Sequence, residues 1–185
     1  MGSKQDTELG SILLELGFVH QEQIDEALEL QKIRPKRLDE LLIDLGYVDE
    51  DHLLDALSRQ FDIPVERNVL TQVERGLTTK TPINFIREYR MAPFRQNGSA
   101  FYVAINDPMN MLPLDDLRLL LGGPVVPVLC RRSDIDSIMD SYFDQQSENA
   151  ADMIGTISMT EDDDGTPYQN LDALESQRDL LDLAN

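Results

Sequence analysis

The stretch that decides the fold is a repeat, ELGSILLELGFV at residues 8–19 and RLDELLIDLGYV at residues 37–48. Extending both copies pairs residues 8–31 with residues 37–60, which gives two units of 24 residues separated by a spacer of five. Eight of the 24 pairs are identical: Leu9/Leu38, Leu13/Leu42, Leu16/Leu45, Gly17/Gly46, Val19/Val48, Ala27/Ala56, Leu28/Leu57 and Gln31/Gln60. A repeat of this length indicates one supersecondary structure used twice.

Each unit predicts two helices. The first helix has apolar residues at i, i+3, i+4 and i+7, in unit one Leu9, Ile12, Leu13 and Leu16. Gly17 and Gly46 then suit a left-handed helix end, and Asp49 is a good N-cap for the second helix of unit two. Neither hairpin can bury its apolar stripe alone, so we expect the two to pack together as a helical subdomain over residues 7–64.

The pattern changes after Pro64, and residues 65–144 predict a small α/β subdomain of order α-β-β-α-β-α. The Asn97-Gly98 pair is a strong hairpin signal between the first two strands, and Pro93 belongs at a sheet edge or a bulge. The second and third strands are parallel if they are neighbours, because a helix connects them. The expected elements are helix 82–89, strands 91–95 and 100–105, helix 114–121, strand 124–130 and helix 133–142. The fold class is therefore α+β.

Acidic residues dominate the charge. The chain has 35 Asp and Glu against 16 Lys and Arg, a formal net charge of −19, which disfavours nucleic acid and anionic membrane surfaces as partners. Residues 145–185 hold ten acids and a single base, Arg178. We therefore predict a flexible acidic linker at residues 145–174 and the start of a helix at residues 175–185.

The sequence contains no recognisable catalytic motif, although carboxylates are abundant. No lysine follows the Gly-x-x-x-x-Gly pattern of a nucleotide phosphate loop, so we expect no enzyme activity and no cofactor in this chain. Cys130 is the only cysteine, which excludes an internal disulfide and a multi-cysteine zinc site. His20 and His52 occupy different positions in the two units, so we expect surface residues rather than a metal pair. No stretch is apolar enough for a transmembrane helix or a signal peptide.

Taken together, these motifs resemble the N-terminal domain of the type II secretion and type IV pilus assembly ATPases. The resemblance covers residues 7–144. It rests on the tandem units, on QFDIPV at 60–65, YRMAP at 89–93 and AFYVAINDP at 100–108, and on the ending SYF at 141–143. The segment DLLDLAN at 179–185 is similar to the one that leads into the next domain of the secretion ATPase, which favours secretion over pilus assembly.

The resemblance implies a non-catalytic docking and regulatory domain that anchors a secretion motor to its inner-membrane platform. The implied partner is the cytoplasmic domain of the inner-membrane secretion L protein. The implied location is cytoplasmic and peripheral at the inner membrane, and ATP and magnesium are expected only in the missing ATPase core.

In one branch of this family the tandem motif binds cyclic di-GMP, and each unit begins Arg-Leu-Gly. Here unit one begins with Glu8 and unit two has Asp39 in place of glycine, so each copy departs from the pattern. A carboxylate at such a position repels a phosphate ligand. The alternative function is therefore a cyclic di-GMP-binding sensor domain of a secretion or pilus ATPase or of a glycosyltransferase. Its degenerate motif positions are Leu9, Gly10, Gly17, Gln31, Arg37, Leu38, Gly46 and Gln60.

Overall fold

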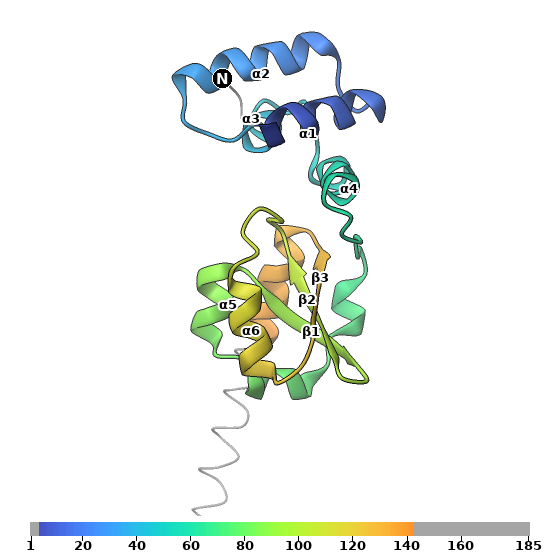
Figure 1. Cartoon of the computed structure of the whole chain (residues 1–185), viewed down its shortest axis with the longest axis vertical. Coiled ribbons are helices and arrows are strands. Elements are labelled where there is room, and N and C mark those ends of the chain that lie inside the picture. Colours follow the sequence, from blue (N-terminus) through green and yellow to red (C-terminus); the bar gives the residue numbers. More distant parts are fainter. Residues whose placement is uncertain (1–3, 143–185) are drawn as a thin grey trace, which may run out of the picture. The chain divides into compact units, whose positions relative to one another are not determined.

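A computed structural model describes residues 4–142, except for the side chains of Arg75, Thr78 and Thr79. The helical elements are α1 (Lys4–Glu15), α2 (Gln21–Ile33), α3 (Leu38–Asp44), α4 (Glu50–Phe61), α5 (Ile83–Tyr89) and α6 (Pro113–Leu121), with 3-10 turns η1 (Val69–Gln72) and η2 (Arg75–Lys80) and helical residues 132–142. The strands are β1 (Ala92–Asn97), β2 (Ala100–Ile105) and β3 (Val125–Leu129) (Figure 1). The predicted linker at 145–174 and the predicted helix start at 175–185 lie outside the described residues.

The four N-terminal helices form the two predicted hairpins, and both first helices end in the same way. Gly17 and Gly46 have φ of +72° and +70°, a left-handed conformation that glycine adopts without strain. The following amide donates to the equivalent carbonyl in each unit, Phe18 to Leu13 and Tyr47 to Leu42, both at 3.0 Å. Asp49 caps α4 by accepting a hydrogen bond from the amide of His52 at 2.8 Å. The repeat in sequence is therefore a repeat in backbone geometry.

The three strands form one sheet in the order β1-β2-β3, antiparallel between β1 and β2 and parallel between β2 and β3. The predicted parallel pair is thus present. Pro93 lies on an edge strand, where the register shifts between Pro93 and Arg95, as its missing amide requires. The hairpin is also present, but Asn97 pairs with Ala100 in the ladder, so the turn residues are Gly98 and Ser99. Gly98 takes the positive φ of this turn, +59°.

Side chains on the two faces of β2 enter two different core clusters. Phe101, Val103 and Ile105 join α6 and the four N-terminal helices in the larger cluster. Ala104 joins the smaller cluster, together with Ile86 of α5 and with Ile135, Ile138 and Tyr142 of residues 132–142. Alternation along one strand therefore explains why helices cover both faces of this sheet (Figure 1). Among the described residues, no helix is both long and apolar enough to cross a membrane.

Candidate functional site

The eight predicted motif residues divide into structural positions and polar positions. Leu9 and Leu38 are fully buried in the core, and the chain reverses at Gly17 and Gly46. Gly10 is also buried, and a Cβ atom there would lie 3.6 Å from Ile24 and 3.7 Å from Leu38. These five residues therefore maintain the fold, which leaves Gln31, Arg37 and Gln60 as the polar groups.

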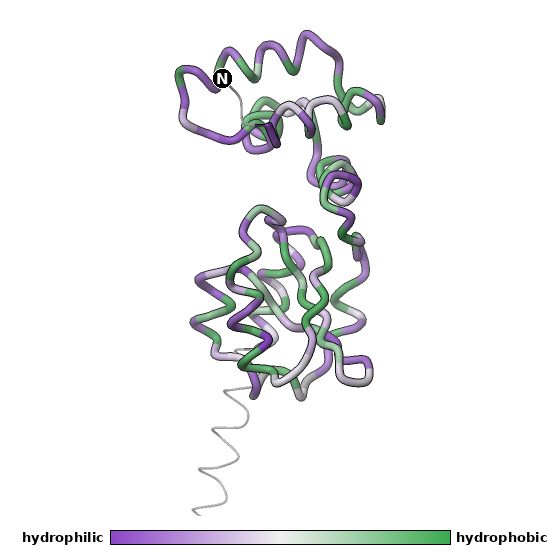
Figure 2. Tube along the Cα trace, viewed as in Figure 1, coloured by the Kyte–Doolittle hydropathy of each residue, from purple (hydrophilic) through white to green (hydrophobic). Residues whose placement is uncertain are grey.

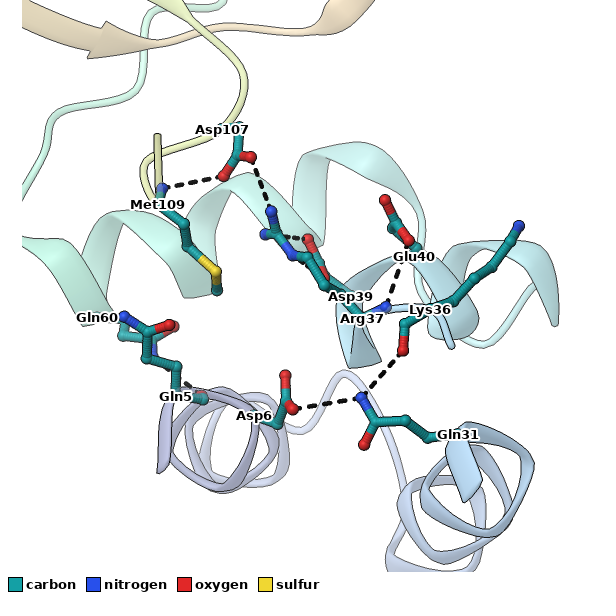
Figure 3. Close-up of polar contacts among 10 residues, drawn as sticks. All are labelled: Gln5, Asp6, Gln31, Lys36, Arg37, Asp39, Glu40, Gln60, Asp107 and Met109. Carbon is teal, nitrogen blue, oxygen red and sulfur yellow. Dashed lines mark hydrogen bonds and ion pairs between the residues drawn. The ribbon is translucent and has the colours of Figure 1, made fainter. Parts of the chain in front are cut away.

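Gln31 and Gln60 close the repeat by symmetric contacts. The Nε2 of Gln31 donates to the carbonyl of Lys36 at 3.1 Å and to Asp6 at 3.3 Å, just before unit two begins. The Nε2 of Gln60 donates to the carbonyl of Gln5 at 3.1 Å, just before unit one begins (Figure 3). Each unit thus ends with an amide bound to the segment that leads into the other unit.

Arg37 is held by two carboxylates (Figure 3). Its Nε and Nη2 donate to the two oxygens of Asp39 at 3.0 and 2.7 Å, and its Nη1 donates to Asp107 at 2.7 Å. Burial lowers the pKa of Arg37, but the charges and hydrogen bonds of Asp39 and Asp107 outweigh burial and raise it. Burial also raises the pKa of Asp39, and Arg37 only partly offsets that effect. The guanidinium fork is therefore already occupied within the chain.

A cavity of about 540 Å³ opens beside Arg37, within the size range of small-molecule sites. Apolar residues of α4, among them Leu54 and Leu57, line one side of it. The charged lining residues are Lys36, Arg37, Arg132, Asp39, Glu40, Asp44, Asp49, Glu50 and Asp107. Acids outnumber bases here, and Lys36 is also paired with Asp44 at 2.6 Å. The lining is therefore unfavourable for a doubly phosphorylated ligand.

Polar contacts also join the start of α4 to the loops after β2 and β3. Glu50 accepts from the side chain of Asn106 at 3.1 Å and from the amide of Arg132 at 2.7 Å. Arg131 donates to both oxygens of Asp51, at 2.8 and 2.5 Å. This bidentate hydrogen bonding lowers the pKa of Asp51. Sequence reasoning missed these residues and Asp107, because their contacts span more than fifty positions of the chain.

Residues 61–149 match the MshEN domain family. The similarity to this family covers a little less than half of the 185 residues. Relatives of this chain include the type IV pilus assembly ATPase PilB of Myxococcus xanthus, 23% identical over 149 residues, which cover 80% of this chain and 26% of PilB. The type II secretion system protein E of Xanthomonas campestris is 29% identical over 98 residues, which cover 53% of this chain and 16% of that protein. The chain thus spans about a quarter or less of the length of these two curated relatives.

Solved structures of two other proteins are similar to this chain in fold. A structure of MshE with cdg has a TM-score of 0.64 and 27% identity, and the match covers 72% of this chain and 97% of that one. The N-terminal domain of XpsE has a TM-score of 0.56 and 19% identity, covering 76% and 96% of the two chains, and shows the same fold. The resemblance to the N-terminal domains of secretion and pilus ATPases is confirmed, and so is the predicted α+β fold.

Proposed function

We propose that this chain is a non-catalytic docking and regulatory domain of a type II secretion ATPase and anchors the motor to the inner-membrane platform. The observation that carries the proposal is the similarity to the MshEN domain family and to proteins named for secretion and pilus ATPases. The sequence adds that no phosphate loop is present in the 185 residues, so ATP and magnesium belong to a separate catalytic core.

The proposed partner is the cytoplasmic domain of the inner-membrane secretion L protein, which places this chain at the cytoplasmic face of that membrane. Residues 1–144 carry a formal net charge of −10, so the complementary surface is basic. Charge complementarity of this kind speeds association and makes it sensitive to salt. Anchoring through a separate domain also keeps the motor at high local concentration beside its platform.

Calorimetry of the 185-residue chain with the purified L domain tests the proposal. We expect saturable binding that weakens as salt is raised, and no ATP hydrolysis by the chain. The control is the same titration with chain unfolded in urea, which keeps the charge and loses the folded surface. Absence of binding by the folded chain, or equal binding by the unfolded chain, refutes docking by the folded domain.

Cyclic di-GMP sensing is the second candidate, and one observation favours it. MshE, solved with cdg, an abbreviation of cyclic di-GMP, is 27% identical to this chain. Three features rank it second. Glu8 stands where the motif has arginine, Asp39 stands where it has glycine, and the Arg37 guanidinium is bound to Asp39 and Asp107.

Binding of labelled cyclic di-GMP separates the two candidates. We expect no binding by the wild-type chain at micromolar ligand, and we expect the double variant E8R/D39G to create it by adding a cation and releasing Arg37. The matched control is E22R/D25G, which makes the same exchange on the exposed side of α2. Tight binding by the wild-type chain would reverse the order of the two functions.

A further inference from the structure

Large apolar side chains are exposed on and beside α6. Leu112 and Leu119 are 82% and 83% exposed, and Leu120 is 47% exposed. The other exposed large hydrophobic residues of the described chain lie singly on α2, α3 and η1: Ile33, Ile43 and Leu70. Single exposed apolar residues are ordinary, whereas a cluster of them marks an interaction site.

Helix geometry places these leucines on one face. Leu112 has helical φ and ψ of −56° and −42°, so it continues α6 toward its N-terminus. Leu112, Asp116, Leu119 and Leu120 follow the spacing i, i+4, i+7 and i+8, and we call this face the α6 surface. The buried residues of the same helix, Leu114, Leu117 and Leu121, form its core stripe. The α6 surface is therefore an apolar column with one carboxylate between its leucines. The hydropathy colours of Figure 2 show that α6 contains both hydrophobic and hydrophilic residues.

A groove of about 350 Å³ runs beside the α6 surface, and it is lined by Met109, Met111, Leu112, Leu114, Asp115 and Arg118. Asp115 is paired with Arg118. Asp116 is exposed and forms no salt bridge with any side chain that the structure describes, so its carboxylate can pair with an external cation. Methionine side chains adapt to the shape of what they contact, which suits a groove that receives apolar side chains.

We propose that the α6 surface docks a basic amphipathic helix of a partner protein. Apolar side chains of that helix cover Leu112 and Leu119, and a Lys or Arg between them pairs with Asp116. Charge selects this occupant, because the chain carries −19 and a second copy would bring like charges together at Asp116. The inference rests on the proposed docking function and assigns the surface that performs it.

The test uses the full 185-residue chain and two probes, the cytoplasmic L domain and a labelled amphipathic peptide of Leu and Lys. We expect L112S/L119S to weaken binding of both probes about tenfold or more, as for residues at the centre of an interface. The control I33S changes an equally exposed residue of α2 and is expected to alter binding less than about twofold.

A second pair of variants tests the carboxylate. D116N removes the charge of the α6 surface, and E22Q removes one exposed charge of α2. We expect D116N to weaken both complexes and reduce their dependence on salt, whereas E22Q leaves both properties close to wild type. Thermal melts should show all four variants folded, since every change is at a solvent-exposed residue.

The outcomes separate the inference from the proposed function. If L112S/L119S and wild type bind equally, the assignment of docking to the α6 surface is overturned, and the proposed docking function is unaffected. Peptide binding that depends on α6, without any binding of the L domain, supports the surface and refutes the L domain as partner. Absence of binding by both probes overturns the inference. The inference is also overturned if the variants change only the oligomeric state of the chain, because a second copy of the chain then occupies the α6 surface.

Discussion

At Arg37, the sequence motif and the structure indicate different roles for the same side chain. An arginine at the start of a repeat is typical of phosphate recognition, yet here its fork is filled by Asp39 and Asp107. Asp39 is 7% exposed, and its carboxylate accepts hydrogen bonds from Arg37 and from the backbone of Glu40. Removing one partner of such a pair costs more free energy than the pair contributes, because the remaining charge is left buried.

We predict that R37Q lowers the free energy of unfolding by about 2 kcal/mol near pH 7. Burial already raises the pKa of Asp39, and loss of Arg37 raises it further. A carboxyl whose pKa is raised by folding stabilises the protein below its unfolded pKa, and that stability is lost as pH rises through the folded pKa. The deficit of R37Q should therefore shrink near pH 4, measured by urea unfolding.

The double variant R37Q/D39N is the control for this prediction. It removes both charges and keeps similar side-chain shapes, so its deficit should be smaller than the sum of the two single deficits. Equal deficits of R37Q at both pH values would show that Asp39 does not depend on Arg37.

Cys130 gives a second prediction at this scale. Burial raises the pKa of the Cys130 thiol to about 12, from an ordinary value of 9.0. The folded state then holds the proton that the unfolded state releases, so stability is full below about pH 9 and falls as pH rises toward about 12. Urea unfolding of wild type and C130A should show a steeper loss in wild type over this range. If the free energies of unfolding of wild type and C130A fell in parallel as pH rises, the prediction would be wrong.

Residue roles could be predicted from the sequence where neighbours along the chain set them. The charge conflict at Asp39 follows from comparing the two units. The contact between Arg37 and Asp107 joins residues 70 positions apart, and no local pattern encodes which loop meets which helix. For the same reason, the cavity beside Arg37 could not be predicted from the sequence.

At the scale of elements, the repeat was predictable because a glycine ends the first helix of each unit. Gly17 and Gly46 end α1 and α3 with nearly equal positive φ, and the two cap hydrogen bonds have equal lengths. The 3-10 turns η1 and η2 were not predicted, because such short turns lack apolar periodicity. The hairpin signal gave the right pair of strands, but pairing of Asn97 with Ala100 moved the turn by one residue.

We predict that G46A lowers the free energy of unfolding by about 1 kcal/mol, because a Cβ atom disfavours the left-handed backbone. A Cβ at this position meets no atom within 4 Å, so the loss is conformational rather than steric. The control is G76A, which also has open space but no positive φ and should change stability by less than about 0.5 kcal/mol. Chemical unfolding of both variants measures the difference. Equal losses would exclude the backbone explanation.

At the scale of the whole molecule, the larger core cluster connects the four N-terminal helices to the sheet within the described residues. That cluster joins buried residues of all four N-terminal helices to residues of β2, β3 and α6, with Leu9, Leu54 and Val103 among them. The polar contacts of Glu50 and Asp51 cross between the same groups of elements. The boundary between two subdomains at residue 64 stays a prediction. Because the two predicted subdomains share a core, they can unfold together.

We therefore predict that the described part of the chain unfolds in one cooperative transition. Leu54 of α4 is 1% exposed and Val103 of β2 is fully buried, so L54A and V103A should each cost about 2–4 kcal/mol. In a single cooperative unit either variant accelerates hydrogen exchange in peptides from both α4 and β2. The control L119A changes an exposed leucine and should leave exchange in both peptides unchanged. If L54A accelerates exchange in α4 but not in β2, the helices and the sheet unfold separately, and the shared core does not couple them.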